Sequence, residues 1–124
     1  MTVRTAYNIL RDHLEKARLG KIEDDLARNY AEDVVLLTGY GVHRGHEGAR
    51  DLEQLLQRQL PDARFTYRTI EVEGDVGFLE WSATSSNGNY VNDGADSYVI
   101  RNGRIVAQTI HYTVYNSKSP LDRQ

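Results

Sequence analysis

The chain has 124 residues, of which 40% are hydrophobic and 27% charged, with no cysteine and a formal net charge of −3. This composition is typical of one globular domain over residues 1–124, excludes disulfides and cysteine-bound zinc, and provides no basic surface for nucleic acid. No apolar run is long enough to cross a membrane, and the N-terminus lacks the apolar core of a signal peptide, so we expect a cytoplasmic protein.

Helical periodicity dominates the first half of the chain. Apolar residues recur every three or four positions over residues 3–18, and a shorter helical pattern with an acidic first turn follows from Ile22 to Tyr30. The apolar run 34–38 has the length of a strand. After a loop at 43–45, a third helical pattern continues until Pro61 stops it.

From residue 63 to 115 the apolar pattern changes to a period of two. Residues 64–73 and 76–85 predict one hairpin, and residues 90–101 and 104–115 predict another. Helices followed by antiparallel strands predict an α+β fold, with three N-terminal helices on the concave face of a curved sheet. We expect an ordered core over about 3–115 and a peripheral tail over 116–124.

The second predicted hairpin carries polar residues on one face. Its turn, Asn102-Gly103, is the strongest short signal for a two-residue connection, and the resulting register places Asp96 opposite Thr109. His111 then lies on the same face, diagonally across from Asp96 at about 7–8 Å between backbones. We predict that Asp96 and His111 form a pair suited to general acid–base chemistry. The alternative is a structural pair that only satisfies its own hydrogen bonds.

The other histidines are weaker candidates. His13 lies on an otherwise apolar helix face, where it either points into a cavity or packs at its edge. His43 and His46 are interpreted as loop and helix-cap residues. The histidine and carboxylate spacings do not match a metal-binding motif, so we expect neither a metal nor a cofactor.

Aromatic and hydroxyl side chains suggest what a pocket would hold. If they line a cavity, they favour a flat or cyclic, mostly apolar ligand with a few oxygens. The predicted pocket residues are Thr38, Tyr40, Trp81, Tyr98 and Thr109. The opposite face of the second hairpin is too apolar to be fully solvated, which indicates a homodimer interface. Its apolar residues are Val99, Val106, Ile110 and Val114.

Several segments, in this order, resemble the nuclear transport factor 2-like superfamily, and most closely its SnoaL-like and ketosteroid-isomerase-like branch. They are Tyr30 to Leu36, His43 to Arg50, Glu73 to Val76, Gly94 to Tyr98 and Asn102 to Ile105. The resemblance covers about residues 3–114 and implies a cone with a pocket at its wide end, often in a homodimer. It does not imply one reaction, because this fold hosts isomerases, cyclases, hydratases and proteins without chemistry.

The residues at the family's catalytic positions indicate which reactions the resemblance implies for this chain. The strand aspartate of ketosteroid isomerases matches Asp96, but their catalytic base falls on Thr38 and their helix tyrosine falls near His13. Steroid isomerisation by that mechanism is therefore not expected. SnoaL-type cyclases keep an acid or a histidine on the last strands, so Asp96 with His111 fits them better.

Two interpretations remain. In the first, the chain is an isomerase, cyclase or hydratase in which Asp96 and His111 exchange protons, His13 is a second donor and Thr38 positions the substrate. In the second, it is a binding or dimerisation module whose pocket holds a ligand unchanged. Threonine at position 38 favours the second, whereas the polar residues gathered on one hairpin face favour the first, which we adopt.

Overall fold

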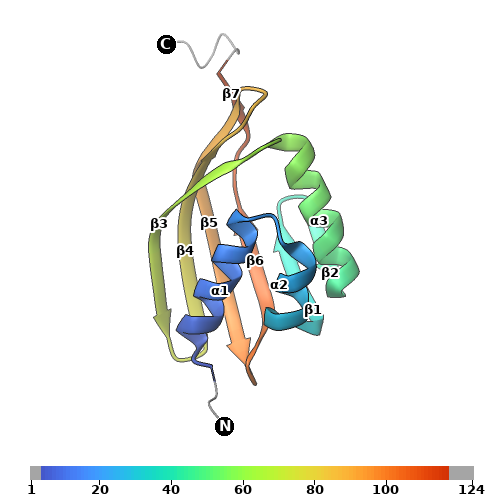
Figure 1. Ribbon diagram of the computed structural model, residues 1–124, viewed down its shortest axis with the longest axis vertical. Helices are drawn as coiled ribbons and strands as arrows, with labels where there is room; N and C mark the ends of the chain where they lie inside the picture. The colour runs from blue at the N-terminus through green and yellow to red at the C-terminus, as the bar shows by residue number, and fades with distance from the viewer. Residues whose placement is uncertain (1–3, 118–124) are drawn as a thin grey trace.

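Three helices and seven strands make up residues 4–117, the part of the chain that the computed structural model describes (Figure 1). The helices are α1 (Ala6–Arg18), α2 (Ile22–Asn29) and α3 (Gly45–Gln59). The strands are β1 (Tyr30–Thr38), β2 (Gly41–Arg44), β3 (Arg64–Glu73), β4 (Val76–Thr84), β5 (Asn89–Arg101), β6 (Arg104–His111) and β7 (Tyr115–Asn116).

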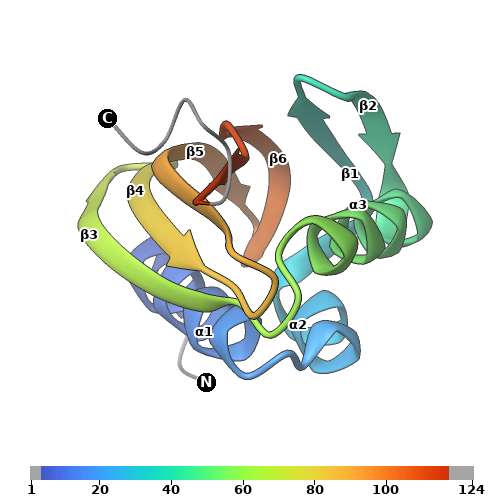
Figure 2. The same cartoon turned by 90° about the horizontal axis from the view of Figure 1, so that it is seen from above.

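The strands form one sheet in the order β2-β1-β6-β5-β4-β3, and the short β7 pairs with β5. Neighbouring strands are antiparallel except β1 and β6, which run parallel. Irregularities interrupt the pairing of β1 with β6, β3 with β4, β4 with β5 and β5 with β6. Such bulges bend and twist a sheet, and the strands accordingly curve around the helices (Figure 2). The predicted α+β cone fold is confirmed.

Helix α1 follows the predicted amphipathic pattern. It begins after Thr5, whose hydroxyl accepts a hydrogen bond from the backbone N–H of Asn8 at 3.0 Å. Its buried side chains Ile9, Leu10 and Leu14 belong to the main hydrophobic core, and the helix contacts β3 and β4. The N-terminal part of the sequence thus supplies one wall of the space enclosed by the sheet.

Two sequence expectations need correction. Residues 41–44 form β2, which pairs antiparallel with β1, so the predicted loop at 43–45 is largely strand. Only four residues long and mostly exposed, β2 gives little periodic signal. Tyr115 and Asn116 pair with β5 rather than starting a peripheral tail, and residues 118–124 of that predicted tail lie outside the described part of the chain.

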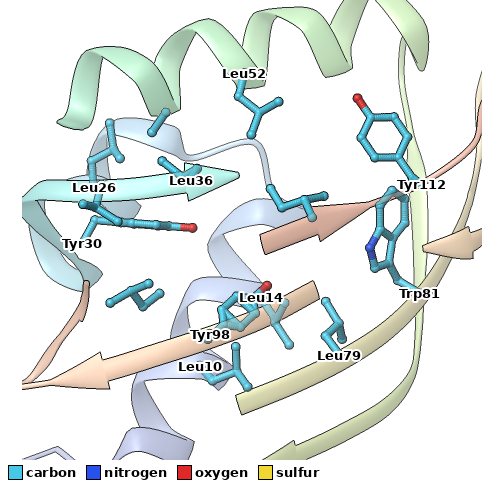
Figure 3. Packing of buried hydrophobic residues seen from close by; sticks show 14 of the residues in the cluster. Leu10, Leu14, Leu26, Tyr30, Leu36, Leu52, Leu79, Trp81, Tyr98 and Tyr112 are labelled. Carbon is cyan, nitrogen blue, oxygen red and sulfur yellow. The ribbon is translucent and has the colours of Figure 1, made fainter. Parts of the chain in front are cut away.

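Between residues 4 and 117, no helix is long and apolar enough to cross a membrane. The core lies between the concave face of the sheet and the three helices. Figure 3 shows Leu10 and Leu14 of α1, Leu52 of α3 and Leu79 of β4 around this interior.

Candidate functional site

The hairpin of β5 and β6 contains a bulge that changes its predicted register. The pairs Arg101–Arg104 and Ile100–Ile105 follow the prediction, but Val99 then pairs with Ala107 instead of Val106. Each later residue of β6 is displaced by one, so Asp96 faces Ile110 rather than Thr109. Because side chains alternate along a strand, this displacement reverses which residues of β6 point inward.

The predicted pairing of Asp96 with His111 is therefore wrong. The His111 side chain is 73% exposed, and its Nε2 lies 3.7 Å from Asp93 Oδ2. Thr109 is also exposed. Ile110, predicted for the outer face, is instead a core residue that lines the interior, and Val114 packs against the same core.

The interior contains a cavity of about 620 Å³ between the helices and the concave face of the sheet. Aromatic side chains form much of one wall, where Trp81 lies edge-on to Phe65 at 5.6 Å between ring centroids, and Phe65 stacks on Tyr67. Trp81 and Tyr98, both predicted as pocket residues, line this cavity. Tyr30, Trp81 and Tyr98 approach it from different strands (Figure 3).

The remaining predicted pocket residues do not line the cavity. Thr38 Oγ1 accepts a hydrogen bond from the backbone N–H of Tyr40 at 2.9 Å and lies 3.3 Å from His43 Nε2. Tyr40 is 53% exposed and packs against Tyr112. The residue aligned with the isomerase base thus lies at the end of β1, outside the cavity lining.

Asp96 is the buried carboxylate of the cavity wall on the sheet side. Its Oδ1 accepts a hydrogen bond from Trp81 Nε1 at 2.9 Å, and its Oδ2 accepts from the Tyr98 hydroxyl at 3.0 Å and from Gln108 Nε2 at 3.3 Å. Burial raises the pKa of Asp96 to about 6, although these hydrogen bonds and the charge of His13 oppose the rise. A carboxyl group with such a pKa exchanges protons near neutrality.

A close backbone approach positions the tryptophan that binds Asp96. Gly94 on β5 pairs with Trp81 on β4, and a Cβ atom at position 94 would lie only 2.3 Å from the indole ring. Glycine is therefore required for the indole to lie across β5 with its N–H directed at Asp96.

His13 and Asp25 form a second polar pair, contributed by α1 and α2. His13 Nδ1 lies 2.6 Å from Asp25 Oδ2, and both side chains are nearly inaccessible to solvent. Asn29 Nδ2 donates to Asp25 Oδ1 at 2.8 Å, which fixes the carboxylate. Burial opposes the charged imidazole, but the charge and hydrogen bond of Asp25, with Asp96 and Asp12, outweigh it and raise the pKa of His13.

Tyr98 connects the two pairs. Its hydroxyl donates to Asp96 Oδ2, and the same oxygen lies 3.5 Å from His13 Nε2. With Nδ1–H directed at Asp25, a protonated His13 presents Nε2–H toward the tyrosine oxygen. The order Asp25, His13, Tyr98, Asp96 is thus a continuous line of groups along which a proton can pass.

Gln108 supports the site from β6. The Tyr30 hydroxyl donates to Gln108 Oε1, and Gln108 Nε2 in turn donates to Asp96. The rings of Tyr30 and Tyr98 also pack edge-on against His13, with centroids 5.4 and 5.6 Å away. The imidazole is therefore held between two tyrosine rings.

Sequence reasoning missed Asp25, Asn29 and Gln108. Asp25 was assigned only to an acidic helix start, although Asp25 and Asn29 are four residues apart and so share one helix face. That spacing was the available signal. No sequence signal indicates Gln108 as a site residue, because only the bulge turns its side chain inward.

Structural comparison shows the same fold in proteins of low sequence identity. A candidate SnoaL-like polyketide cyclase from Mesorhizobium loti is 21% identical, with 88% of this chain and 100% of that chain covered and a TM-score of 0.67. A candidate polyketide cyclase from Sinorhizobium meliloti is 16% identical, with 82% and 92% covered and a TM-score of 0.71. TerC, co-crystallised with polyporic acid, is 20% identical, with 88% and 92% covered and a TM-score of 0.71.

Comparison with curated proteins gives no match. Residues 10–108, most of the chain, match the SnoaL-like domain family. This segment extends from α1 to β6 and contains His13, Asp25, Asp96 and Gln108. The chain belongs to the SnoaL-like domain family.

Proposed function

We propose that the chain is a cofactor-independent acid–base enzyme of the isomerase, cyclase or hydratase kind, acting on a cyclic, mostly apolar small molecule. The observation that carries the proposal is the line of contacts from Asp96 through Tyr98 to His13 along the wall of a 620 Å³ cavity. Aromatic walls suit a ring system, and the few polar groups converge on one place. His13 replaces His111 as the partner of Asp96.

In the proposed reaction, each proton transfer has a named donor and acceptor. The Asp96 carboxylate removes a proton from carbon next to a substrate carbonyl, and the electron pair of that C–H bond moves to the carbonyl oxygen. The Tyr98 hydroxyl donates a proton to that oxygen, and the His13 imidazolium returns one to Tyr98. The product is an enol. Protonated Asp96 then gives its proton to another carbon of the conjugated system, or to the oxygen of a second carbonyl that the enol carbon attacks, while the enol oxygen returns its proton to Tyr98 and through it to His13.

Other features support this assignment. Asp25, held by Asn29, orients the imidazole and stabilises its charged form, as a carboxylate does for a catalytic histidine. Two structural neighbours are candidate polyketide cyclases, and a third was crystallised with polyporic acid. The position of Thr38 outside the cavity lining argues against the mechanism of the ketosteroid isomerases.

The test is turnover of a panel of cyclic ketones, enones, epoxides and polyporic acid by the wild type and two variants. We expect Asp96→Asn and His13→Gln each to lower kcat by about 100- to 10,000-fold, the usual contribution of a general acid or base. His111→Gln is the matched control, because it makes the same change at an exposed imidazole. Its activity should equal that of the wild type.

The alternative is a ligand-binding module of the same fold. It would be favoured if panel compounds bind with equal affinity to wild type and both variants while none is converted. Loss of activity in His111→Gln but not in His13→Gln would contradict the assignment of His13.

A further inference from the structure

Helix α3 places one carboxyl group among the apolar side chains that line the cavity. Ala49, Leu52 and Leu56 recur at helical spacing along this side of the helix, Leu60 follows at its C-terminal cap, and Glu53 stands among them. An unpaired charge in an apolar surrounding lowers stability. A residue that served packing alone would be apolar at this position.

The Glu53 carboxylate receives little stabilisation from hydrogen bonds or ion pairs with other protein groups. Among residues 4–117 its one hydrogen bond comes from Gln57, whose Nε2 donates to Oε1 at 3.2 Å. None of the ion pairs in that part of the chain includes Glu53. Its Oε2 is therefore available to water or to a ligand in the cavity.

The interior of the cavity is rich in carboxyl groups. Burial raises the pKa of Glu53, the hydrogen bond from Gln57 lowers it, and the charges of Asp25 and His13 act on it in opposite directions. With Asp62 and Asp96, four carboxyl groups therefore share the cavity lining with the imidazole of His13. The cationic side chains of the lining, Arg18 and Lys21, both lie at the α1–α2 connection, and Arg18 is already paired with Glu15 at 2.5 Å.

We propose that Glu53 determines substrate specificity: it accepts a hydrogen bond from a hydroxyl group of the ring system and disfavours a carboxylate at the same place. The inference rests on the proposed function, since it assumes that this cavity holds the substrate. The ring faces pack against the aromatic wall of Phe65, Tyr67 and Trp81, and the hydroxyl is directed at α3. A buried polar group that goes unpaired whenever the hydroxyl is absent gives strong discrimination.

Three matched probes test the proposal without turnover: 2-naphthol, 2-methoxynaphthalene and 2-naphthoate. The chain has one tryptophan, so its indole N–H gives a single NMR signal, and that group donates to Asp96 inside the cavity. Titration of this signal reports binding at the site. We expect 2-naphthol to bind at least about tenfold more tightly than 2-methoxynaphthalene, the scale of a hydrogen bond to a charged group, and 2-naphthoate to bind weakest.

Two variants of Glu53 separate hydrogen bonding from charge. Glu53→Leu should remove the preference for 2-naphthol over its methyl ether, while its melting temperature stays equal or rises. Glu53→Gln keeps an acceptor and loses the charge, so it should retain part of that preference and bind 2-naphthoate more tightly. Asp51→Asn is the control, since it removes the same charge at an exposed position of α3. It should change no affinity.

An unchanged preference in Glu53→Leu would overturn the proposal, as would failure of all three probes to shift the Trp81 signal up to their solubility limits. The binding preference of Glu53 and the catalytic activity can fail independently of each other. A preference that depends on Glu53 in a protein without turnover would refute the enzyme and leave the specificity role intact. Turnover that requires Asp96, with a substrate preference that replacing Glu53 leaves unchanged, would support the enzyme and refute the specificity role of Glu53.

Discussion

Asp96 is costly to the folded state, because it keeps a carboxyl group away from solvent, and the hydrogen bonds from Trp81, Tyr98 and Gln108 offset only part of that desolvation. Only 6% of its surface is exposed. Buried ion pairs such as His13 with Asp25 are weak contributors to stability, because desolvation offsets their attraction. A site that combines both features is therefore better explained by its chemistry than by packing.

The raised pKa of Asp96 predicts how stability depends on pH. Its value is about 6 in the folded protein and 3.8 ordinarily, so the folded state binds this proton more tightly than the unfolded state. The resulting stabilisation is complete below the ordinary value and is lost as pH rises through about 6. Asp96→Asn has no carboxyl group at this position, so its stability does not fall in this way. The free energy of unfolding of Asp96→Asn minus that of the wild type should therefore increase by roughly 2–3 kcal/mol between pH 4 and 6.5.

Urea unfolding of both proteins at the two pH values measures this change, and titratable groups common to both cancel in the difference. The upper limit of pH 6.5 keeps the titration of His13 largely outside the window, because its pKa is raised. A difference that stays constant or shrinks with rising pH would contradict the raised pKa of Asp96.

Helix α3 depends on a close approach to β2. A Cβ atom at Gly48 would lie 2.7 Å from the carbonyl carbon of His43, a backbone atom that cannot rotate away. Helix propensity alone would favour alanine by about 1 kcal/mol. We expect the clash to outweigh it, so that Gly48→Ala lowers the free energy of unfolding by about 1–2 kcal/mol. Gln54→Ala, at an exposed position of the same helix, is the control in parallel thermal melts, and equal stability of the two variants would refute the expectation.

The sequence predicted elements better than it predicted the site. Periodicity located α1, α3 and both hairpins, because each buries one face over many residues. It could not reveal one extra residue in β6, since a bulge leaves the Asn102-Gly103 turn and the first two pairs unchanged. That single residue decides whether Gln108 or Thr109 lies on the inner face of the sheet with Asp96. Glu53 was within reach of sequence reasoning, as a charge inside an apolar helical stripe.

The outer face of the sheet carries a row of apolar residues that crosses several strands. The register places Val76, Val99, Ala107 and Val35 side by side on four neighbouring strands. The neighbouring row contains three exposed apolar side chains, Phe78, Leu37 and Val42. Exposed apolar surface that extends over several strands is typical of a protein–protein interface. Of the residues predicted from sequence for this face, Val99 belongs to the row, whereas Ile110 lines the cavity.

We expect this face to form an isologous homodimer, because the same apolar rows on two copies are self-complementary. Phe78→Lys puts a charge at the β4 end of the apolar rows, opposite Glu71 on β3, which compensates it in the free monomer. Sedimentation velocity at micromolar concentration should give a dimer for the wild type and a monomer for Phe78→Lys, with an unchanged fold by circular dichroism. Thr84→Lys adds the same charge at the exposed end of β4 and should remain dimeric. A monomeric wild type, or a dimer that survives in Phe78→Lys, would show that this face is not the interface.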